Sequence, residues 1–278
     1  MIETSPPLAG VVGWPIRHSR SPVLHGHWLK RYGIAGHYIP LGIAPQDFEN
    51  GIRSLPRLGF RGVNVTLPYK QTVLPLADKV SDRAALIGAA NTLIFREDGG
   101  IYADNTDGYG FIENLRQRAP SWSARSGPCL VLGAGGAARA VISALLTEGA
   151  PAIRVANRTR QRAELLRDQY GARITVVDWN RAADAMEGAM TIVNTTSLGM
   201  KGQPELNLSF ARAHGAALAT DIVYTPLDTP FLIEARAAGL ETVDGIGMLL
   251  HQAVPGFRQW FEHVPEVDDD LRRAVLAG

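Results

Sequence analysis

Short apolar runs alternate with amphipathic stretches through the second half of the chain. A helical stretch from about Gly108 to Arg118 precedes six strand-like runs: CLVLG, AIRVAN, ITVVD, TIVNTT, ALATDIV and ETVDG, with helical stretches between the earlier ones. This alternation predicts a parallel sheet, because parallel neighbours must be joined by long crossovers. A doubly wound sheet of this kind binds ligands at the carboxyl ends of its strands.

The first third of the chain alternates less regularly. Ser21 before Pro22 predicts the N-cap and first position of a helix. The apolar stripe of that helix is Leu24, Trp28 and Tyr32. HYIPLGI and GVNVT read as strands, and the helix between them is marked by Phe48, Ile52 and Leu55. NTLIF and GIYADN, separated by REDGG, predict a hairpin, and the tail of the chain is helical. We therefore expect an α/β protein with two α/β domains.

Composition narrows the classes of function. The 278 residues suffice for two ordinary domains, and 28 basic against 27 acidic side chains give no field to attract nucleic acid or an anionic membrane. No apolar run approaches the roughly 20 residues of a spanning helix, and MIETSPPLAG does not resemble a secretory signal. The single cysteine, Cys129, fits a reducing compartment and heads a strand-like run, so we expect a buried thiol in a cytoplasmic protein. No His, Cys or acidic cluster has metal-ligand spacing, and His25 and His27 point different ways on a helix.

The segment CLVLGAGGAARAVISALL carries the first specific chemistry. Gly133, Gly135 and Ala138 fill the G-x-G-x-x-[G/A] pattern between a strand and a helix. The first glycine permits a tight turn, the second lets the main chain approach a pyrophosphate, and the small third residue allows close packing. The helix N-terminus then presents N–H groups to the anion. The sequence predicts a dinucleotide site, whose loop also contains Ala134, Gly136 and Ala137.

The end of the following strand indicates which dinucleotide binds. An NAD site typically has an acidic residue there, but this chain has Asn157, Arg158 and Thr159, with Arg162 a turn later. A carboxylate would repel a 2′-phosphate, whereas the Arg158 guanidinium can bind it with charge-assisted hydrogen bonds. The alternative is that these residues only form the solvent-exposed, basic start of a helix. We expect NADP to be the cofactor.

A lysine follows a strand and a proline in GVNVTLPYKQ. Lys70 can move a proton at a carbinol oxygen if neighbours hold it near a substrate. Asp107, at the expected junction between the domains, can orient it and favour the ammonium form. Asp104 is the alternative acid, but it lies inside an expected strand, which favours a structural role. Spacing alone does not pair Lys70 with Asp107.

The sequence resembles the shikimate dehydrogenase family. The resemblance lies in ordered motifs over nearly the whole chain: HSRSP, NVTLPYK, GAANT, DNTDG, GAGGAARA, NRT, NTTSLGM, DIVYTPLDTP and DGIGMLLHQA. It implies reversible, NADPH-dependent reduction of 3-dehydroshikimate to shikimate, a step of aromatic amino-acid biosynthesis. A substrate with one carboxylate and several hydroxyls requires many short polar partners, which agrees with these motifs.

The resemblance also implies residue roles. Lys70 and Asp107 would be the catalytic pair and would also contact the substrate. The other implied substrate contacts are Ser19 and Ser21 for the carboxylate, Thr66 and Asn91 for ring hydroxyls, and Tyr224 and Gln252. The implied cofactor contacts beyond the glycine loop and the basic segment are Thr195, Ile222 and Gly245. Plainer roles remain open: a helix cap for Ser21, an ordinary strand residue for Thr66, a turn residue for Asn91, domain packing for Tyr224 and a solvent-facing position for Gln252.

Three alternatives share these motifs. One is a quinate/shikimate dehydrogenase of broader substrate or NAD use, against which the Arg158 segment argues. Others are a related NADP-linked reductase of aminoshikimate-type substrates and a non-catalytic NADP-binding regulator, which would be expected to lack Lys70 or Asp107. We expect residues 1–106 with 245–278 to form the substrate domain and 107–244 a Rossmann-type NADP domain, with a cleft between them. The family includes monomers and homodimers, and the sequence does not decide between them.

Overall fold

The computed structural model describes residues 6–278. The first five residues of MIETSPPLAG, the segment that the sequence analysis compares with a secretory signal, lie outside the described residues. The chain divides into two compact units. The first unit is Met1–Thr106 with Leu250–Gly278, and the second unit is Asp107–Leu249. The sequence analysis divides the chain at 106/107 and 244/245, and the compact units divide at 106/107 and 249/250.

The first unit contains a mixed six-stranded sheet in the order β2-β1-β3-β5-β6-β4. Its strands are β1 (Leu8–Gly13), β2 (His37–Gly42), β3 (Phe60–Val65), β4 (Lys79–Val80), β5 (Thr92–Phe95) and β6 (Ile101–Asp104). β1 pairs in parallel with β2 and β3, and β5 pairs antiparallel with β3 and β6. The predicted β5–β6 hairpin is therefore confirmed, whereas β1, at the parallel side of the sheet, was not predicted.

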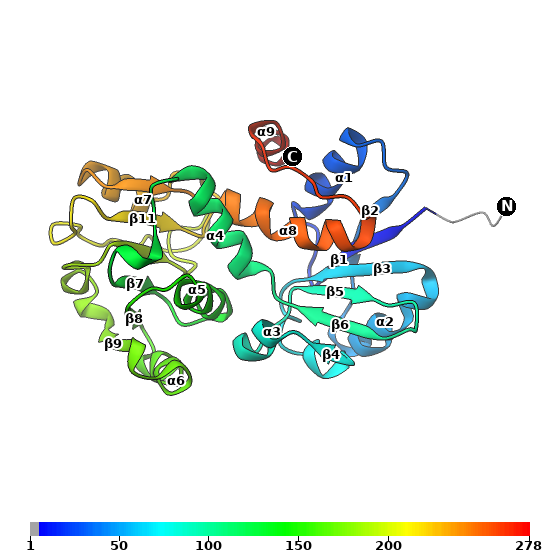
Figure 1. Cartoon of the computed structure of the whole chain (residues 1–278), viewed down its shortest axis with the longest axis horizontal. Helices are drawn as coiled ribbons and strands as arrows, with labels where there is room; N and C mark the ends of the chain where they lie inside the picture. The colour runs from blue at the N-terminus through cyan, green and yellow to red at the C-terminus, as the bar shows by residue number, and fades with distance from the viewer. Residues whose placement is uncertain (1–5) are drawn as a thin grey trace. The chain divides into compact units, whose positions relative to one another are not determined.

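Helices cover the sheet of the first unit. They are α1 (Ser21–Arg31), α2 (Phe48–Ser54), α3 (Asp82–Ile87), the greater part of α8 (Ile246–Phe261) and α9 (Asp269–Ala277). α1 packs against α9, as Figure 1 shows. Trp260 of α8 donates its indole N–H to the Leu93 carbonyl of β5, at 3.1 Å. A side chain at Gly62 of β3 would collide with this indole, because a Cβ there would lie 2.1 Å from Nε1. Glycine in the strand thus lets the helix lie close on the sheet.

The second unit contains a fully parallel sheet in the order β12-β11-β10-β7-β8-β9, which confirms the predicted doubly wound architecture. Its strands are β7 (Cys129–Leu132), β8 (Ile153–Asn157), β9 (Ile174–Asp178), β10 (Thr191–Asn194), β11 (Leu218–Asp221) and β12 (Glu241–Val243). Its helices are α4 (Asp107–Arg118), α5 (Gly136–Thr147), α6 (Arg160–Tyr170), α7 (Pro230–Ala237) and the first turn of α8.

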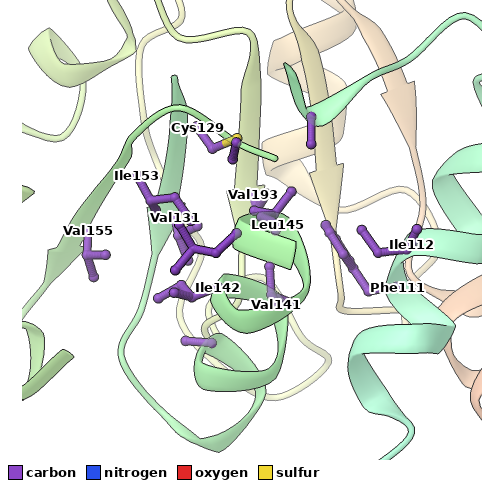
Figure 2. Close-up of a cluster of buried hydrophobic side chains, with 14 of the residues drawn as sticks. Phe111, Ile112, Cys129, Val131, Val141, Ile142, Leu145, Ile153, Val155 and Val193 are labelled. Atoms are coloured by element: carbon purple, nitrogen blue, oxygen red, sulfur yellow. The ribbon is translucent and has the colours of Figure 1, made fainter. Parts of the chain in front are cut away.

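Both faces of this parallel sheet are apolar. Odd-numbered residues of β7, such as Val131, face the helices α4 and α5, and even-numbered residues, such as Leu130, face the opposite layer. Figure 2 shows the first of these clusters, in which Phe111 of α4 and Val141 of α5 lie beside side chains from the strands. Cys129 belongs to the same cluster and is a buried free thiol, as predicted. No helix within residues 6–278 is long and apolar enough to cross a membrane.

Candidate active site

The loops after β1 and β3 of the first unit are fixed to one another. The main-chain N–H of Thr66 donates to the Val12 carbonyl at 2.9 Å, and that of Trp14 donates to the Leu67 carbonyl at 3.1 Å. A Cβ at Gly13 would lie 2.6 Å from the Thr66 methyl group, so only glycine leaves room for this threonine. Because parallel strands end at the same edge of a sheet, the loop that leads to Ser19 begins beside Thr66.

The prediction that Ser21 caps α1 is wrong. The helix begins at Ser21 itself, the N-cap is Arg20 in a helical conformation, and no side chain caps the helix. The cap is displaced because the chain already turns helically at Arg20, so Ser21 occupies the first turn. Ser21 is buried, and its main-chain N–H donates to the Ser19 hydroxyl at 3.3 Å. The two serines of HSRSP therefore lie together.

Lys70 lies in a tight turn that follows β3. The Tyr69 N–H donates to the Thr66 carbonyl at 2.9 Å, so the chain reverses over Pro68, whose peptide bond to Leu67 is cis. The Tyr69 ring is buried and stacks on Phe48, with ring centroids 3.9 Å apart. The Lys70 carbonyl accepts a hydrogen bond from the Ala90 N–H at 2.7 Å. This bond holds the turn that carries Lys70 next to the segment that carries Asn91.

Asn91 and Gln252 meet although 161 residues separate them in the chain. Asn91 immediately precedes β5, Gln252 lies on α8, and only 3% and 8% of their surfaces are exposed. The Asn91 amide N–H donates to the Gln252 side-chain oxygen at 3.2 Å. Gln252 therefore faces the sheet rather than solvent, and Asn91 is fully enclosed rather than placed on an open turn.

The two aspartates of DNTDG have different surroundings. Asp104 ends β6 and forms an ion pair with Arg83, and it also accepts a hydrogen bond from the Ser81 hydroxyl at 2.7 Å. Burial works against the charge of Asp104, but the bonds from Arg83 and Ser81 hold its pKa below the usual value. Asp107 is buried at the first position of α4, in the second unit. The carboxylate of Asp104 is thus committed to a structural ion pair, as its place in a strand predicted.

The glycine loop of the second unit has one crowded and two open positions. Gly133 has a φ of +110°, and a Cβ there would lie 2.6 Å from the Thr195 hydroxyl. By contrast, a Cβ at Gly135 or Gly136 would meet nothing within 4 Å. Gly136 begins the 12-residue helix α5. The exposed main-chain N–H groups at the N-terminus of this helix are therefore not covered by side chains of the glycine loop. This arrangement fits a phosphate group, which needs donors without side chains in the way.

The basic segment at the end of β8 is exposed. Asn157 ends the strand and donates to the Thr159 carbonyl at 2.7 Å, and Thr159 is the N-cap of α6 without a side-chain capping bond. Arg158 and Arg162 form no ion pair with any residue that the structure describes, whereas Arg160 pairs with Asp178 and Glu164. Guanidinium groups without a carboxylate partner are suited to a phosphate. The residues present fit a dinucleotide with a 2′-phosphate.

The remaining expected cofactor residues follow the ends of β10, β11 and β12. Thr195 is held by two bonds to the Leu132 carbonyl of β7, from its N–H at 2.9 Å and its hydroxyl at 2.6 Å. Ile222 follows β11, and a Cβ at Gly245 would lie 2.5 Å from its carbonyl carbon. Gly245 must therefore be glycine for the main chain after β12 to pass Ile222. Tyr224 lies two residues beyond Ile222 and is half-buried.

A buried carboxylate that the sequence analysis did not assign fixes these loops. Asp221 ends β11 and accepts bonds from the Asn194 amide at 3.0 Å, the Val223 N–H at 2.9 Å and the Thr229 hydroxyl at 2.7 Å. Burial raises the pKa of Asp221 to about 6, against the opposing effect of these three donors. Asn194 and Asp221 open the motifs NTTSLGM and DIVYTPLDTP, and the signal that could have found them is a polar residue at the end of an apolar strand.

Residues 6–278 contain no group of three or more His, Cys, Asp or Glu side chains that could hold a metal ion. His25 lies inside an aromatic cluster and stacks on Tyr38, with centroids 3.8 Å apart. Burial lowers the pKa of His25 to about 3, so the ring is neutral.

Comparisons with known proteins give consistent matches. The family model for the shikimate dehydrogenase substrate binding domain matches residues 11–93, and the model for shikimate / quinate 5-dehydrogenase matches residues 115–201. The shikimate dehydrogenase (NADP(+)) of Paracoccus denitrificans strain Pd 1222 is 61% identical over 282 residues, with 100% of both chains covered. That of Jannaschia sp. strain CCS1 is 59% identical, again over 100% of both chains.

Solved structures agree with these matches. The shikimate 5-dehydrogenase of Thermus thermophilus, in complex with NADP(H) and shikimate, has a TM-score of 0.86 at 36% identity, with 97% of this chain and 98% of that chain covered. The quinate dehydrogenase of Corynebacterium glutamicum, in complex with NAD, has a TM-score of 0.90 at 33% identity, covering 98% and 99%. With its two α/β units, its glycine loop and this similarity over its full length, the chain belongs to the shikimate dehydrogenase family.

Proposed function

We propose that this protein catalyses the reversible, NADPH-dependent reduction of 3-dehydroshikimate to shikimate, within the shikimate pathway of aromatic amino-acid biosynthesis. The observation that carries the proposal is 61% identity over the full length of a shikimate dehydrogenase (NADP(+)), with both predicted catalytic residues present. The first unit is the substrate domain, and the second unit is the NADP domain.

Substrate recognition is assigned to short polar side chains of the first unit. Ser19 and Ser21, which lie together, bind the carboxylate. Thr66, Asn91 and Gln252 bind the ring hydroxyls, and Tyr224 is also assigned to the substrate. Such a set discriminates strongly, because an analogue that lacks a hydroxyl leaves a buried polar group unpaired.

Proton transfer is assigned to Lys70. Bound NADPH supplies the hydride. In reduction, the Lys70 ammonium donates a proton to the developing alkoxide oxygen, and in oxidation the neutral amine accepts the proton of the shikimate hydroxyl. Asp107 is the second residue of the proposed catalytic pair.

The cofactor is assigned to the glycine loop and the exposed basic segment. Gly133, Ala134, Gly135, Gly136 and Ala137 form the pyrophosphate cradle. Arg158 binds the 2′-phosphate with help from a short polar and basic set: Asn157, Thr159 and Arg162. Thr195, Ile222 and Gly245 contact the nicotinamide half.

A quinate dehydrogenase is the second candidate, since one such enzyme has a TM-score of 0.90 to this chain. That structure contains NAD, whereas the exposed Arg158 of this chain favours NADP. We also place the enzyme in the cytoplasm, as a monomer or homodimer. The single cysteine, Cys129, allows no internal disulfide, which supports a reducing compartment. Light scattering of the purified protein would decide the assembly.

Initial rates of NADPH absorbance change test the function, with shikimate or quinate and NADP or NAD as the substrate pairs. We expect shikimate with NADP to dominate and Lys70→Ala to lose about 10²- to 10⁴-fold in kcat while it still binds shikimate. Lys79→Ala, at an exposed position of β4, is the matched control and should be as active as wild type. Equal rates with quinate or NAD would favour the second candidate. A fully active Lys70→Ala would show that another group carries the proton.

A further inference from the structure

Five buried polar side chains of the first unit form one hydrogen-bonded network around Asn91. They share exposures of 8% or less and are Asn64, Asn91, Thr92, Thr106 and Gln252. Only Asn91 and Gln252 are assigned to the substrate. The other three have no role in the proposed reaction, although each is fully enclosed and each bonds to another member of the network.

The oxygen of the Asn91 amide has a fixed position. It accepts a bond from the main-chain N–H of Thr106 at 2.8 Å and a second from the Thr92 hydroxyl at 3.0 Å. A main-chain N–H can only donate, so the atom that faces it must be the carbonyl oxygen and not the NH₂ group. Rotating the amide by half a turn would place donor against donor in a buried site, which is unfavourable. The Thr106 hydroxyl also lies within hydrogen-bond distance of this oxygen, at 3.1 Å.

The Thr92 hydroxyl is itself directed toward Asn91. Thr92 accepts a bond from the Asn64 amide at 3.3 Å, and the same amide also donates to the Asn91 main-chain carbonyl at 3.1 Å. The Asn64 oxygen in turn accepts from the Tyr38 hydroxyl at 2.7 Å. The Asn64 amide has a single orientation as well, because the Asn91 main-chain carbonyl can only accept and must face the NH₂ group. The proton of Thr92 is therefore available for the Asn91 oxygen.

The orientation of Asn91 passes on to Gln252. With its oxygen committed, Asn91 turns its nitrogen to the Gln252 side-chain oxygen, 3.2 Å away, which places the Gln252 nitrogen at the other end of that amide. Thr106 also holds the helix that carries Gln252, because its hydroxyl donates to the Gln252 main-chain carbonyl at 2.8 Å. One residue thus fixes the Asn91 amide with its N–H group and the Gln252 backbone with its hydroxyl.

We propose that Thr106 is a positioning residue that keeps Asn91 and Gln252 facing the substrate as hydrogen-bond donors. The pair then recognises a ring oxygen as an acceptor, which a hydroxyl or ketone oxygen satisfies and an amine in the ammonium form does not. This inference rests on the proposed function, because it takes shikimate to lie against Asn91 and Gln252. Thr92 supports the same orientation through its bond to the Asn91 side-chain oxygen.

The test is the dissociation constant of shikimate, measured by calorimetry for wild type, Thr106→Val and Thr106→Ser. Valine keeps the main-chain N–H and the branched shape and removes only the hydroxyl. We expect Thr106→Val to weaken shikimate binding about 10-fold, the loss typical of one hydrogen bond, with NADP binding unchanged within about twofold. Serine should restore shikimate binding to within about threefold of wild type. Unchanged shikimate binding in Thr106→Val would overturn the inference.

Deoxy analogues of shikimate separate positioning from general loss of stability. For the analogue that lacks the oxygen that the pair contacts, Thr106→Val should bind as well as wild type, because there is no acceptor to lose. An equal loss for every analogue would overturn the inference. Thr191→Val is the matched control: its buried hydroxyl accepts from the Trp122 indole at 2.9 Å in the second unit, so it should lower the melting temperature without changing the shikimate affinity.

Two further results keep the inference distinct from the proposed function. If Thr106→Val does not fold, Thr92→Val tests the same orientation and should also weaken shikimate binding, and unchanged binding would overturn the inference. If wild type binds and oxidises shikimate while both valine variants bind it normally, only the inference fails. If wild type binds no shikimate, the proposed function fails, and the inference fails with it.

Discussion

The two units present their strand ends in opposite ways. In the first unit, the ends of β3 and β6 and the start of β5 carry enclosed side chains that other side chains hold in place, such as Asn91 held by Thr92 and Thr106. In the second unit, the end of β7 carries almost no side chains, and Gly135 and Gly136 leave the main chain bare. The first unit is therefore sensitive to the loss of single polar groups, and the second unit is sensitive to added volume.

The difference follows from the chemistry of the two proposed ligands. A small hydroxylated acid differs from its analogues by single oxygens, so specific side chains in fixed orientations are needed to distinguish it. A pyrophosphate needs only several donors at close range, which the main chain of a helix N-terminus supplies once side chains are absent. Each of the following changes tests one side of this contrast.

Adding one methyl group at Gly133 should have the largest effect. Gly133→Ala forces alanine to a φ of +110° and places its Cβ 2.6 Å from the Thr195 hydroxyl. We expect a loss of about 1–3 kcal/mol in the free energy of unfolding from the backbone conformation, with a further loss from the collision, and no measurable NADP binding. Urea unfolding and NADP fluorescence titration measure the two effects.

Gly135→Ala is the matched control for Gly133→Ala. Its backbone has a φ of −85°, and its Cβ would meet no protein atom within 4 Å. The free energy of unfolding should change by less than about 1 kcal/mol. NADP affinity should fall, because the added methyl group occupies space that we assign to the pyrophosphate. If both alanine variants destabilised the fold equally, the glycines at 135 and 136 would serve the stability of the fold and not the binding of NADP.

Removing Arg158 should change the choice of cofactor. Arg158→Ala would lose the charged hydrogen bonds that we propose to the 2′-phosphate, worth about 1.5–3 kcal/mol. We therefore expect kcat/KM for NADP to fall about 10- to 100-fold, while that for NAD stays within about twofold. Arg160→Ala is the control, because Arg160 already pairs with Asp178 and Glu164. Equal losses with NADP and NAD would show that Arg158 does not bind the 2′-phosphate.

The sequence predicted the second unit better than the first. The six strands of the parallel sheet and the glycine loop were all predicted, because strands buried on both faces form continuous apolar runs. In the first unit, β1 was missed because two of its six residues are glycines. A Cβ at Gly10 would lie 2.5 Å from the Ile39 carbonyl oxygen, so glycine here reflects close approach of the main chains rather than a turn.

Residue types at the candidate site were predictable, but their partners were not. Asn91 and Gln252 were named from motifs, yet nothing in their spacing shows a hydrogen bond across 161 residues. Thr106 and Asp221 lie inside recognised motifs and were assigned no role, because their functions depend on which atoms the fold brings to them. Ser21 was misread because sequence spacing does not show that Arg20 already adopts a helical conformation.

The two units also each contain a buried carboxylate, and the two carboxylates make the stability depend on pH in opposite directions. Burial works to raise the pKa of Asp104, but Arg83 and Ser81 hold it below its usual value, so its stabilising contribution is present at neutral pH and is lost as pH falls through that lowered pKa. Burial raises the pKa of Asp221 to about 6, so the folded state binds a proton that the unfolded state has released. Stability should therefore fall by roughly 3 kcal/mol as pH rises from about 4 to 6.

Asparagine variants separate these two carboxylates. At neutral pH, Asp104→Asn should lower the free energy of unfolding by about 1–3 kcal/mol, because the new NH₂ group faces the Arg83 guanidinium. Asp221→Asn keeps its oxygen toward Val223 and Asn194 and can donate to Thr229, so it should be no less stable than wild type at neutral pH. Its difference from wild type should disappear only below about pH 3, where the wild-type carboxyl is protonated in both the folded and the unfolded state. A pH-independent difference would contradict the raised pKa.

The smallest expected effect is on the chemical reactivity of the Cys129 thiol, which lies in the apolar cluster of the second unit. Cys129 is fully buried, and burial raises its pKa to about 11, so at mildly alkaline pH it is neither accessible nor ionised. We expect no reaction with a thiol-specific chromogenic reagent in the native protein and one equivalent in denaturant, because only unfolding exposes the sulfur. Rapid native labelling would mean that β7 separates from its neighbours in the folded protein. The bare glycine loop that follows β7 would then rest on a mobile strand, and Gly133→Ala should lose less stability than a rigid second unit requires.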